Sequence, residues 1–111
     1  MNWINLTEEN QLQELIVQSN INPQAIFKHS TRCNVSSIAL QRLKGSKEKA
    51  AVDMYYLDLL KYRSLSDKVT EVFKEHHQSP QVLLIKNGEC VYTESHLGIT
   101  MKDLVEQTIA G

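Results

Sequence analysis

Several features that would mark a specialised class of protein are scarce or missing in this sequence of 111 residues. Its two cysteines, Cys33 and Cys90, lie 57 positions apart, so they do not form the closely spaced ligand pairs of a zinc site. No apolar run approaches the ~20 residues of a membrane-spanning helix. The first ten residues, MNWINLTEEN, lack the basic and apolar regions of a signal peptide. We therefore expect a cytoplasmic protein with free thiols, because structural disulfides are rare inside cells.

The sequence also lacks an excess of charge of either sign, since the formal net charge is −1. This balance argues against nucleic acid as the main partner, because nucleic-acid-binding domains usually carry a clear basic excess. We find no repeat, low-complexity tract or linker, and the composition, with 41% hydrophobic and 23% charged residues, is ordinary for a globular protein. The length fits one domain, so we expect a single domain over residues 1–111.

What is present is an alternation of strand and helix patterns. We expect strands at 3–6, 25–29, 52–57, 82–86 and 89–95, and helices that begin near Thr7, Val35, Ser64 and Thr100. Asn87 and Gly88 form the strongest short hairpin signal, because both turn residues must take positive φ. The order β-α-β-α-β-α-β-β-α predicts an α/β fold with a mixed central sheet and helices on both faces.

This order, with a cysteine after the second strand and a proline before the fourth, resembles the thioredoxin fold over nearly the whole chain. The segments FKHSTRCNVSS, YYLDLLKYRSLSDKV and HQSPQVLLIKNGE more narrowly resemble the bacillithiol-system redox-active family, whose members are monothiol bacilliredoxins. The usual corner of that family reads KHST-x-C-P-x-S, and Asn34 replaces its proline here. Asn34 restores an N–H donor and loosens the backbone, because proline at the first helical position removes that donor and stiffens the corner.

Cys33 stands where the strand at 25–29 meets the next helix, and this position predicts a reactive thiol. The unpaired N–H groups of a helix N-terminus carry roughly half a positive charge, which favours the thiolate, the nucleophilic form. Ser36 occupies the place of the resolving cysteine in dithiol enzymes, and a serine cannot attack a disulfide. Its hydroxyl either bonds the thiolate or belongs to an ordinary first-turn serine. We interpret Cys90 as a packing residue, on the same face of an outer strand as Tyr92. The alternative is a resolving thiol, which the distance of an outer strand from the corner disfavours.

The resemblance also implies substrate-binding residues beside Cys33. It implies a cis Ser79–Pro80 bond that leaves the Ser79 backbone free to pair with an extended client segment. The alternative is a trans proline at the start of an edge strand. His29 and His77 precede the corner and the proline loop, where each either tunes the thiol and shuttles a proton or is a polar residue at the end of an element.

Two cations, Lys28 and Arg32, flank the corner as exposed charges, and they either bind the malate carboxylates of bacillithiol or are merely solvated.

The resemblance implies a thiol–disulfide oxidoreductase without bound cofactor or metal, nucleic-acid partner or membrane partner. The resemblance further implies that this oxidoreductase removes bacillithiol, or a similar low-molecular-weight thiol, from client proteins through Cys33. Free bacillithiol or a reductase then restores the thiol. Two alternatives stay open. One is a non-catalytic interaction module. The other is an iron–sulfur-carrying, glutaredoxin-like protein, which Asn34 and the NGECVY hairpin disfavour because those proteins have glycines there.

Overall fold

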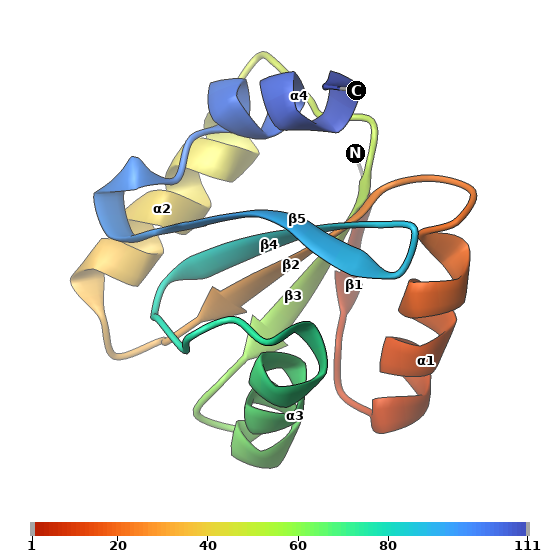
Figure 1. Cartoon of the computed structure of the whole chain (residues 1–111). Coiled ribbons are helices and arrows are strands. Elements are labelled where there is room, and N and C mark those ends of the chain that lie inside the picture. The colour runs from red at the N-terminus through yellow and green to blue at the C-terminus, as the bar shows by residue number, and fades with distance from the viewer. Residues whose placement is uncertain (1, 111) are drawn as a thin grey trace.

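The structure, a computed structural model, describes residues 2–110 and contains one five-stranded sheet in the order β1-β3-β2-β4-β5 (Figure 1). The strands are β1 (Asn2–Asn5), β2 (Gln24–His29), β3 (Asp53–Asp58), β4 (Gln81–Lys86) and β5 (Glu89–Ser95). β1, β3 and β2 are parallel, β4 runs antiparallel to β2, and β5 runs antiparallel to β4. The predicted mixed sheet is therefore correct. The single-domain prediction also includes residues 1 and 111, which lie outside the described residues.

Helices cover both faces of this sheet, as the sequence predicts. They are α1 (Glu9–Gln18), α2 (Asn34–Gly45), α3 (Arg63–Phe73) and α4 (Met101–Ile109), and a 3-10 turn, η1 (His96–Gly98), precedes α4. Figure 1 shows α2 and α4 on one face and α1 and α3 on the other, and each pair buries its own hydrophobic cluster against the sheet. Within residues 2–110, no helix has the length and apolar character needed to cross a bilayer.

The central strand β2 is buried along its whole length, because both of its faces are covered. Successive side chains of a strand point to opposite faces. Phe27 therefore belongs to the α2/α4 cluster and Ile26 to the α1/α3 cluster. The same alternation directs Lys28 toward α3 and His29 toward α2, at the carboxyl end of the strand.

The hairpin between β4 and β5 turns where predicted, with φ of 52° at Asn87 and 78° at Gly88. Beyond the turn, a β-bulge interrupts the pairing, since Ile85 pairs with Cys90 whereas Leu84 pairs with Tyr92. Cys90 consequently packs against the α1/α3 cluster and Tyr92 against the α2/α4 cluster. The prediction that Cys90 and Tyr92 share a face is wrong, because the extra residue of a bulge reverses the alternation.

Two of the predicted helix starts are displaced. α1 is capped by Glu8 rather than by Thr7, and the residue before α3 is Tyr62, so Ser64 lies inside the helix and does not cap it. The start of α4 is as predicted, because the hydroxyl of Thr100 accepts a hydrogen bond from the first turn of the helix.

Candidate active site

The candidate nucleophile Cys33 is the N-cap residue of α2, with extended backbone angles (φ −112°, ψ 118°) and a partly exposed side chain. Its N–H donates to the carbonyl of Ser30 at 3.1 Å, and its own carbonyl accepts the first helical bond from Ser37 at 3.1 Å. No hydrogen bond from the Cys33 side chain caps the helix, and the first turn contains no acidic residue. The N-terminus of α2 is therefore suited to stabilising a negative charge beside the sulfur.

Ser36 faces inward from α2 and is fully buried. Its Oγ accepts a hydrogen bond from the N–H of Ser30 at 3.1 Å and lies 2.6 Å from Nδ1 of His29. The His29 ring in turn stacks on Phe27, with centroids 5.9 Å apart, and contacts the Tyr56 ring at 5.4 Å. Ser36 thus ties the turn that carries the nucleophile to the end of β2. Across residues 2–110, the hydrogen bonds of Ser36 include none to the thiol.

The His29 imidazole is neutral at pH 7, because burial lowers its pKa below the usual value of 6.5 while the Asp58 carboxylate only partly opposes this shift. A neutral ring carries one proton, and its position decides the role of Ser36. With the proton on Nε2, Ser36 donates to Nδ1. With the proton on Nδ1, the ring donates to Ser36, and the hydroxyl proton becomes free to bond another group.

Lys28 is not an exposed cation beside the corner, so that prediction is wrong. Its side chain is fully buried against α3, because the alternation of β2 points it there. Nζ donates to the carbonyl of Ser66 and to Oγ1 of Thr70, both at 3.0 Å, and lies 3.3 Å from Nδ1 of His77. Arg32, in contrast, is exposed in the turn before Cys33, where a cation can meet a bound anion.

Burial lowers the pKa values of both Lys28 and His77. It lowers the pKa of Lys28 from 10.5 to about 8, although the Asp67 carboxylate acts in the opposite direction. The pKa of His77 is also lowered, by burial first and then by the positive charges of Lys28 and Arg63. At pH 7 the arrangement is therefore a charged ammonium that donates to a neutral imidazole.

The loop before β4 lies at the same edge of the sheet as the corner. Lys28 pairs with Gln81 in the antiparallel register, so β4 begins where β2 ends. The Ser79–Pro80 peptide bond is cis, as the resemblance implies. No hydrogen bond from the Ser79 backbone to another residue is found in the part of the chain that the structure describes, and its buried Oγ has no partner there. The edge that carries Cys33 therefore has a backbone segment able to pair with an extended polypeptide.

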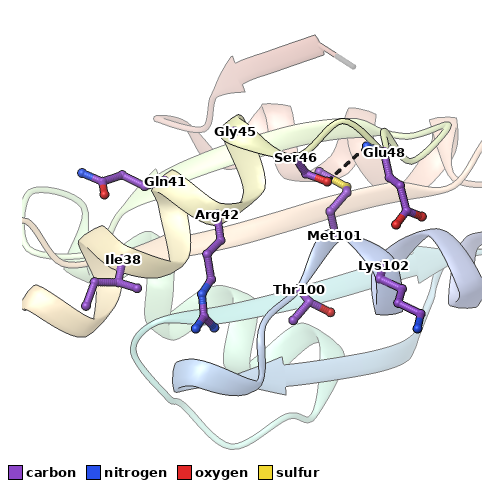
Figure 2. A pocket seen from close by; sticks show the side chains of 9 residues that line it. All are labelled: Ile38, Gln41, Arg42, Gly45, Ser46, Glu48, Thr100, Met101 and Lys102. Carbon is purple, nitrogen blue, oxygen red and sulfur yellow. Dashed lines mark hydrogen bonds between the residues drawn. The ribbon is translucent and has the colours of Figure 1, made fainter.

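The turn η1 links this loop to α2. The N–H of His96 donates to the carbonyl of Pro80 at 3.1 Å, and Nη1 of Arg42 donates to the carbonyl of Leu97 at 2.9 Å. Figure 2 shows Arg42 extending from α2 beside a pocket of about 580 Å³ that α2 shares with the start of α4. Cys33 does not line this pocket, so the pocket is separate from the corner.

The second thiol has a different environment. Cys90 lies on the edge strand β5, where burial, followed by the nearby Glu75 carboxylate, raises its pKa to about 11. Both cysteines are free, and residues 2–110 contain no group of three or more His, Cys, Asp or Glu side chains that could hold a metal ion. Cys90 is therefore protonated at neutral pH and is a poor nucleophile there.

Sequence reasoning missed the partners of Lys28 and His29. Ser66 and Thr70 follow Lys28 by 38 and 42 positions, and the local sequence of α3 does not indicate that they bind a lysine. Tyr56, which packs on His29, reads only as a strand residue. A usable signal was the position of Lys28 itself, inside the buried run AIFKH, because a lysine in a central strand must have its charge satisfied by other elements.

The comparison with protein families decides the family of the chain, because the family model described as Monothiol bacilliredoxin BrxC matches residues 4–104. The chain belongs to the monothiol bacilliredoxin family. Among solved structures, this bacilliredoxin is similar to a protein described as a candidate oxidoreductase with a thioredoxin fold. The two are 28% identical with a TM-score of 0.81, over 94% of this chain and 91% of the other.

Two thioredoxins with lower identity to this bacilliredoxin show the same fold. The reduced thioredoxin pre-protein of Schistosoma mansoni is 21% identical with a TM-score of 0.78, over 98% of this chain and 100% of the other. The thioredoxin of Malassezia sympodialis is 16% identical with a TM-score of 0.74, over 99% and 92%. Family and fold together support a thiol-redox role, that of a thiol oxidoreductase in general.

Proposed function

We propose that this bacilliredoxin removes bacillithiol from mixed disulfides on client proteins, in the cytoplasm, through Cys33. One observation carries the proposal: a single thiol caps α2, and the residue at the place of a second thiol is Ser36, whose hydroxyl is bonded to Ser30 and His29. Such a corner accepts a thiol but cannot expel it internally. Cys90 does not supply the missing thiol, because it lies on the edge strand with a raised pKa.

The proposed reaction is a transfer of one disulfide bond without net oxidation. The Cys33 thiolate attacks the bacillithiol sulfur of the client mixed disulfide, the new sulfur–sulfur bond forms, and the client sulfur leaves as a thiolate that takes up a proton. A second thiolate, from free bacillithiol or from a reductase, then attacks the bacillithiol sulfur on Cys33. That step releases the Cys33 thiolate and places the disulfide on the second thiol.

The chain supplies position and charge for these steps. The N-terminus of α2 stabilises the attacking and departing Cys33 thiolate, because its first-turn N–H groups have no side-chain cap. The Ser36–Ser30 bond holds the turn. Arg32, exposed next to Cys33, offers a cation for the malate carboxylates, and the free Ser79 backbone offers a strand-like edge for the client.

Intact-protein mass spectrometry tests the proposal directly. The reduced protein is mixed with a bacillithiolated client, and we expect one bacillithiol adduct on the protein and an equal amount of reduced client. Cys33→Ser should form no adduct, whereas the matched variant Cys90→Ser should form as much as the wild type. Transfer that persists in Cys33→Ser, or a wild type that takes no bacillithiol while Cys33 alkylates readily, would exclude this function.

A further inference from the structure

Lys28 is a buried cation that the reaction above does not use. Its ammonium has three N–H groups, and three acceptors surround it: the Ser66 carbonyl, Oγ1 of Thr70 and Nδ1 of His77. No carboxylate forms an ion pair with it within residues 2–110. A charge that is buried without an ionic partner destabilises the folded state unless hydrogen bonds compensate for lost hydration. Each N–H group of the ammonium therefore has an acceptor, and these three contacts offset part of its lost hydration.

The loop that joins α3 to β4, residues 74–80, is held from two sides. The buried amide of Gln81 donates from Nε2 to the carbonyl of His76 at 3.0 Å, and its Oε1 accepts from the N–H of Gln78 at 3.3 Å. Lys28 engages the residue between them, His77, through the ring. Lys28 and Gln81 are direct cross-strand partners. The residues at 76, 77 and 78 are therefore fixed from paired positions on β2 and β4.

We propose that Lys28 is a positioning residue for client recognition, which acts through His77 to hold the loop at 74–80 so that the Ser79 backbone can pair with the client polypeptide. The inference rests on the proposed function and adds to it the group that selects protein substrates over small disulfides. The ammonium donates to Nδ1, so the His77 proton stays on Nε2. A side chain without this donor leaves the ring free to turn, and the loop then keeps its bonds to Gln81 and His96 but loses its attachment at residue 77.

The placement of Lys28 separates this role from the chemistry at Cys33. Lys28 faces α3, whereas the Ser36–His29 pair that supports the nucleophile faces α2. Loss of Lys28 should therefore weaken the binding of an extended client without changing the intrinsic reactivity of the thiol. A small mixed disulfide, which offers no polypeptide backbone to the Ser79 edge, should be processed as before.

The test compares two substrates: a bacillithiolated extended peptide, and the mixed disulfide of bacillithiol with cysteine. For Lys28→Met we expect KM for the peptide to rise about tenfold, the size of one or two lost hydrogen bonds, with kcat nearly unchanged. The rate with the small disulfide should change less than twofold. Lys86→Met is the matched control, because that lysine also donates from a strand to more than one acceptor, the carbonyls of Gln107 and Ala110, at the opposite end of β4.

His77 provides a second pair of variants, which leave the lysine and its bonds to Ser66 and Thr70 in place. His77→Gln keeps an acceptor for the ammonium and should retain the low KM, whereas His77→Leu should reproduce the defect of Lys28→Met. An unchanged peptide KM in folded Lys28→Met and His77→Leu would overturn the inference. An equal loss with both substrates would overturn it as well, because the effect would then lie on the thiol.

Failure of the proposed function gives a different result. In that case the wild type itself transfers bacillithiol from neither substrate, and the inference falls with it. The ¹⁵N NMR signals of the His77 ring report the contact independently of activity. We expect an unprotonated Nδ1 in the wild type and a mixture of tautomers in Lys28→Met, and a wild-type ring protonated at Nδ1 would overturn the positioning role on its own.

Discussion

The buried ammonium of Lys28 gives a quantitative prediction for stability against pH. Replacing Lys28 by methionine keeps a long flexible side chain of similar volume but removes the charge. In the wild type, the decrease of the Lys28 pKa from 10.5 to about 8 corresponds to ~3 kcal/mol by which the charged form destabilises the fold, at ~1.4 kcal/mol for each pKa unit. The variant has no such contribution at any pH.

The direction in which stability changes with pH follows from how many protons the folded and unfolded chains bind. Below pH 8 the lysine is protonated in both the folded and the unfolded chain, so the full destabilisation is present. Between pH 8 and 10.5 the unfolded chain holds a proton that the folded chain has released, and the stability of the wild type therefore rises relative to the variant. We expect the difference in unfolding free energy between the two proteins to change by ~3 kcal/mol over this interval, in favour of the wild type.

Urea denaturation under reducing conditions, at steps from pH 7 to 10.5, measures this difference. Comparing two proteins cancels the contributions of Cys90 and Tyr92, whose raised pKa values lower stability at alkaline pH in both. The offset between the curves depends on the hydrogen bonds lost to Ser66 and Thr70, but the slope depends only on the charge. Parallel curves would refute the reasoning, because they would mean that the Lys28 ammonium carries no penalty in the fold.

Three further outcomes are expected. Cys90→Ser should leave bacillithiol transfer within about twofold of the wild type, since a partly buried thiol with a raised pKa supplies little thiolate. A large loss in the transfer assay would make Cys90 a resolving thiol. Ser36→Ala should lower the unfolding free energy by about 1–3 kcal/mol, because the buried Ser30 N–H and the His29 ring lose their partner; an unchanged urea midpoint would contradict this. Gly88→Ala should lower the unfolding free energy by about 1 kcal/mol in the same assay, because the φ of 78° strains any residue with a Cβ. An added Cβ would lie 3.8 Å from the Ile16 side chain, which is ordinary contact. A much larger loss would point to steric crowding instead.

Local signals predicted much of the fold. The hairpin was predictable because the geometry of a two-residue turn is fixed by the two residues within it, Asn87 and Gly88. The start of α3 was not, because its competitor lies in the preceding strand. Oδ1 of Asp58 accepts the N–H groups of Leu60 and Lys61, and the chain turns into the helix before Ser64 is reached. The spacing of a capping motif therefore does not reveal whether an upstream side chain, here Asp58, forms the turn that begins the helix earlier.

In the candidate site too, features fixed by local sequence were predictable and features fixed by distant residues were not. The placement of Cys33 at the start of α2 follows from a strand-to-helix boundary, which the sequence displays. The fate of Lys28 depends on which face of β2 it occupies and on what α3 offers there, and both are tertiary properties. The bulge between Cys90 and Tyr92 has no glycine to announce it, so the two-residue alternation misled the prediction for that strand.

The parallel arrangement of β1, β3 and β2 has a consequence for how partners arrive. Each of these strands is followed by a helix, so α1, α2 and α3 all begin at the edge that carries Cys33. α1 starts with two glutamates, whereas α2 and α3 have neither an acidic first turn nor a side-chain cap. Exposed Arg32, Lys61 and Arg63 stand beside these two helix starts.

The starts of α2 and α3 therefore carry positive charge on a chain whose net charge is −1, while the carboxylates of Glu8, Glu9 and Asp58 lie elsewhere along the same edge. We expect these two helix starts and three side chains to favour the approach of an anionic disulfide to Cys33 over that of a neutral one. Encounter rates should then fall as ionic strength shortens the Debye length, which is ~8 Å under physiological conditions, while rates for a neutral disulfide stay level. The topology of the sheet thus acts on the approach of the substrate as well as on the geometry of the thiol.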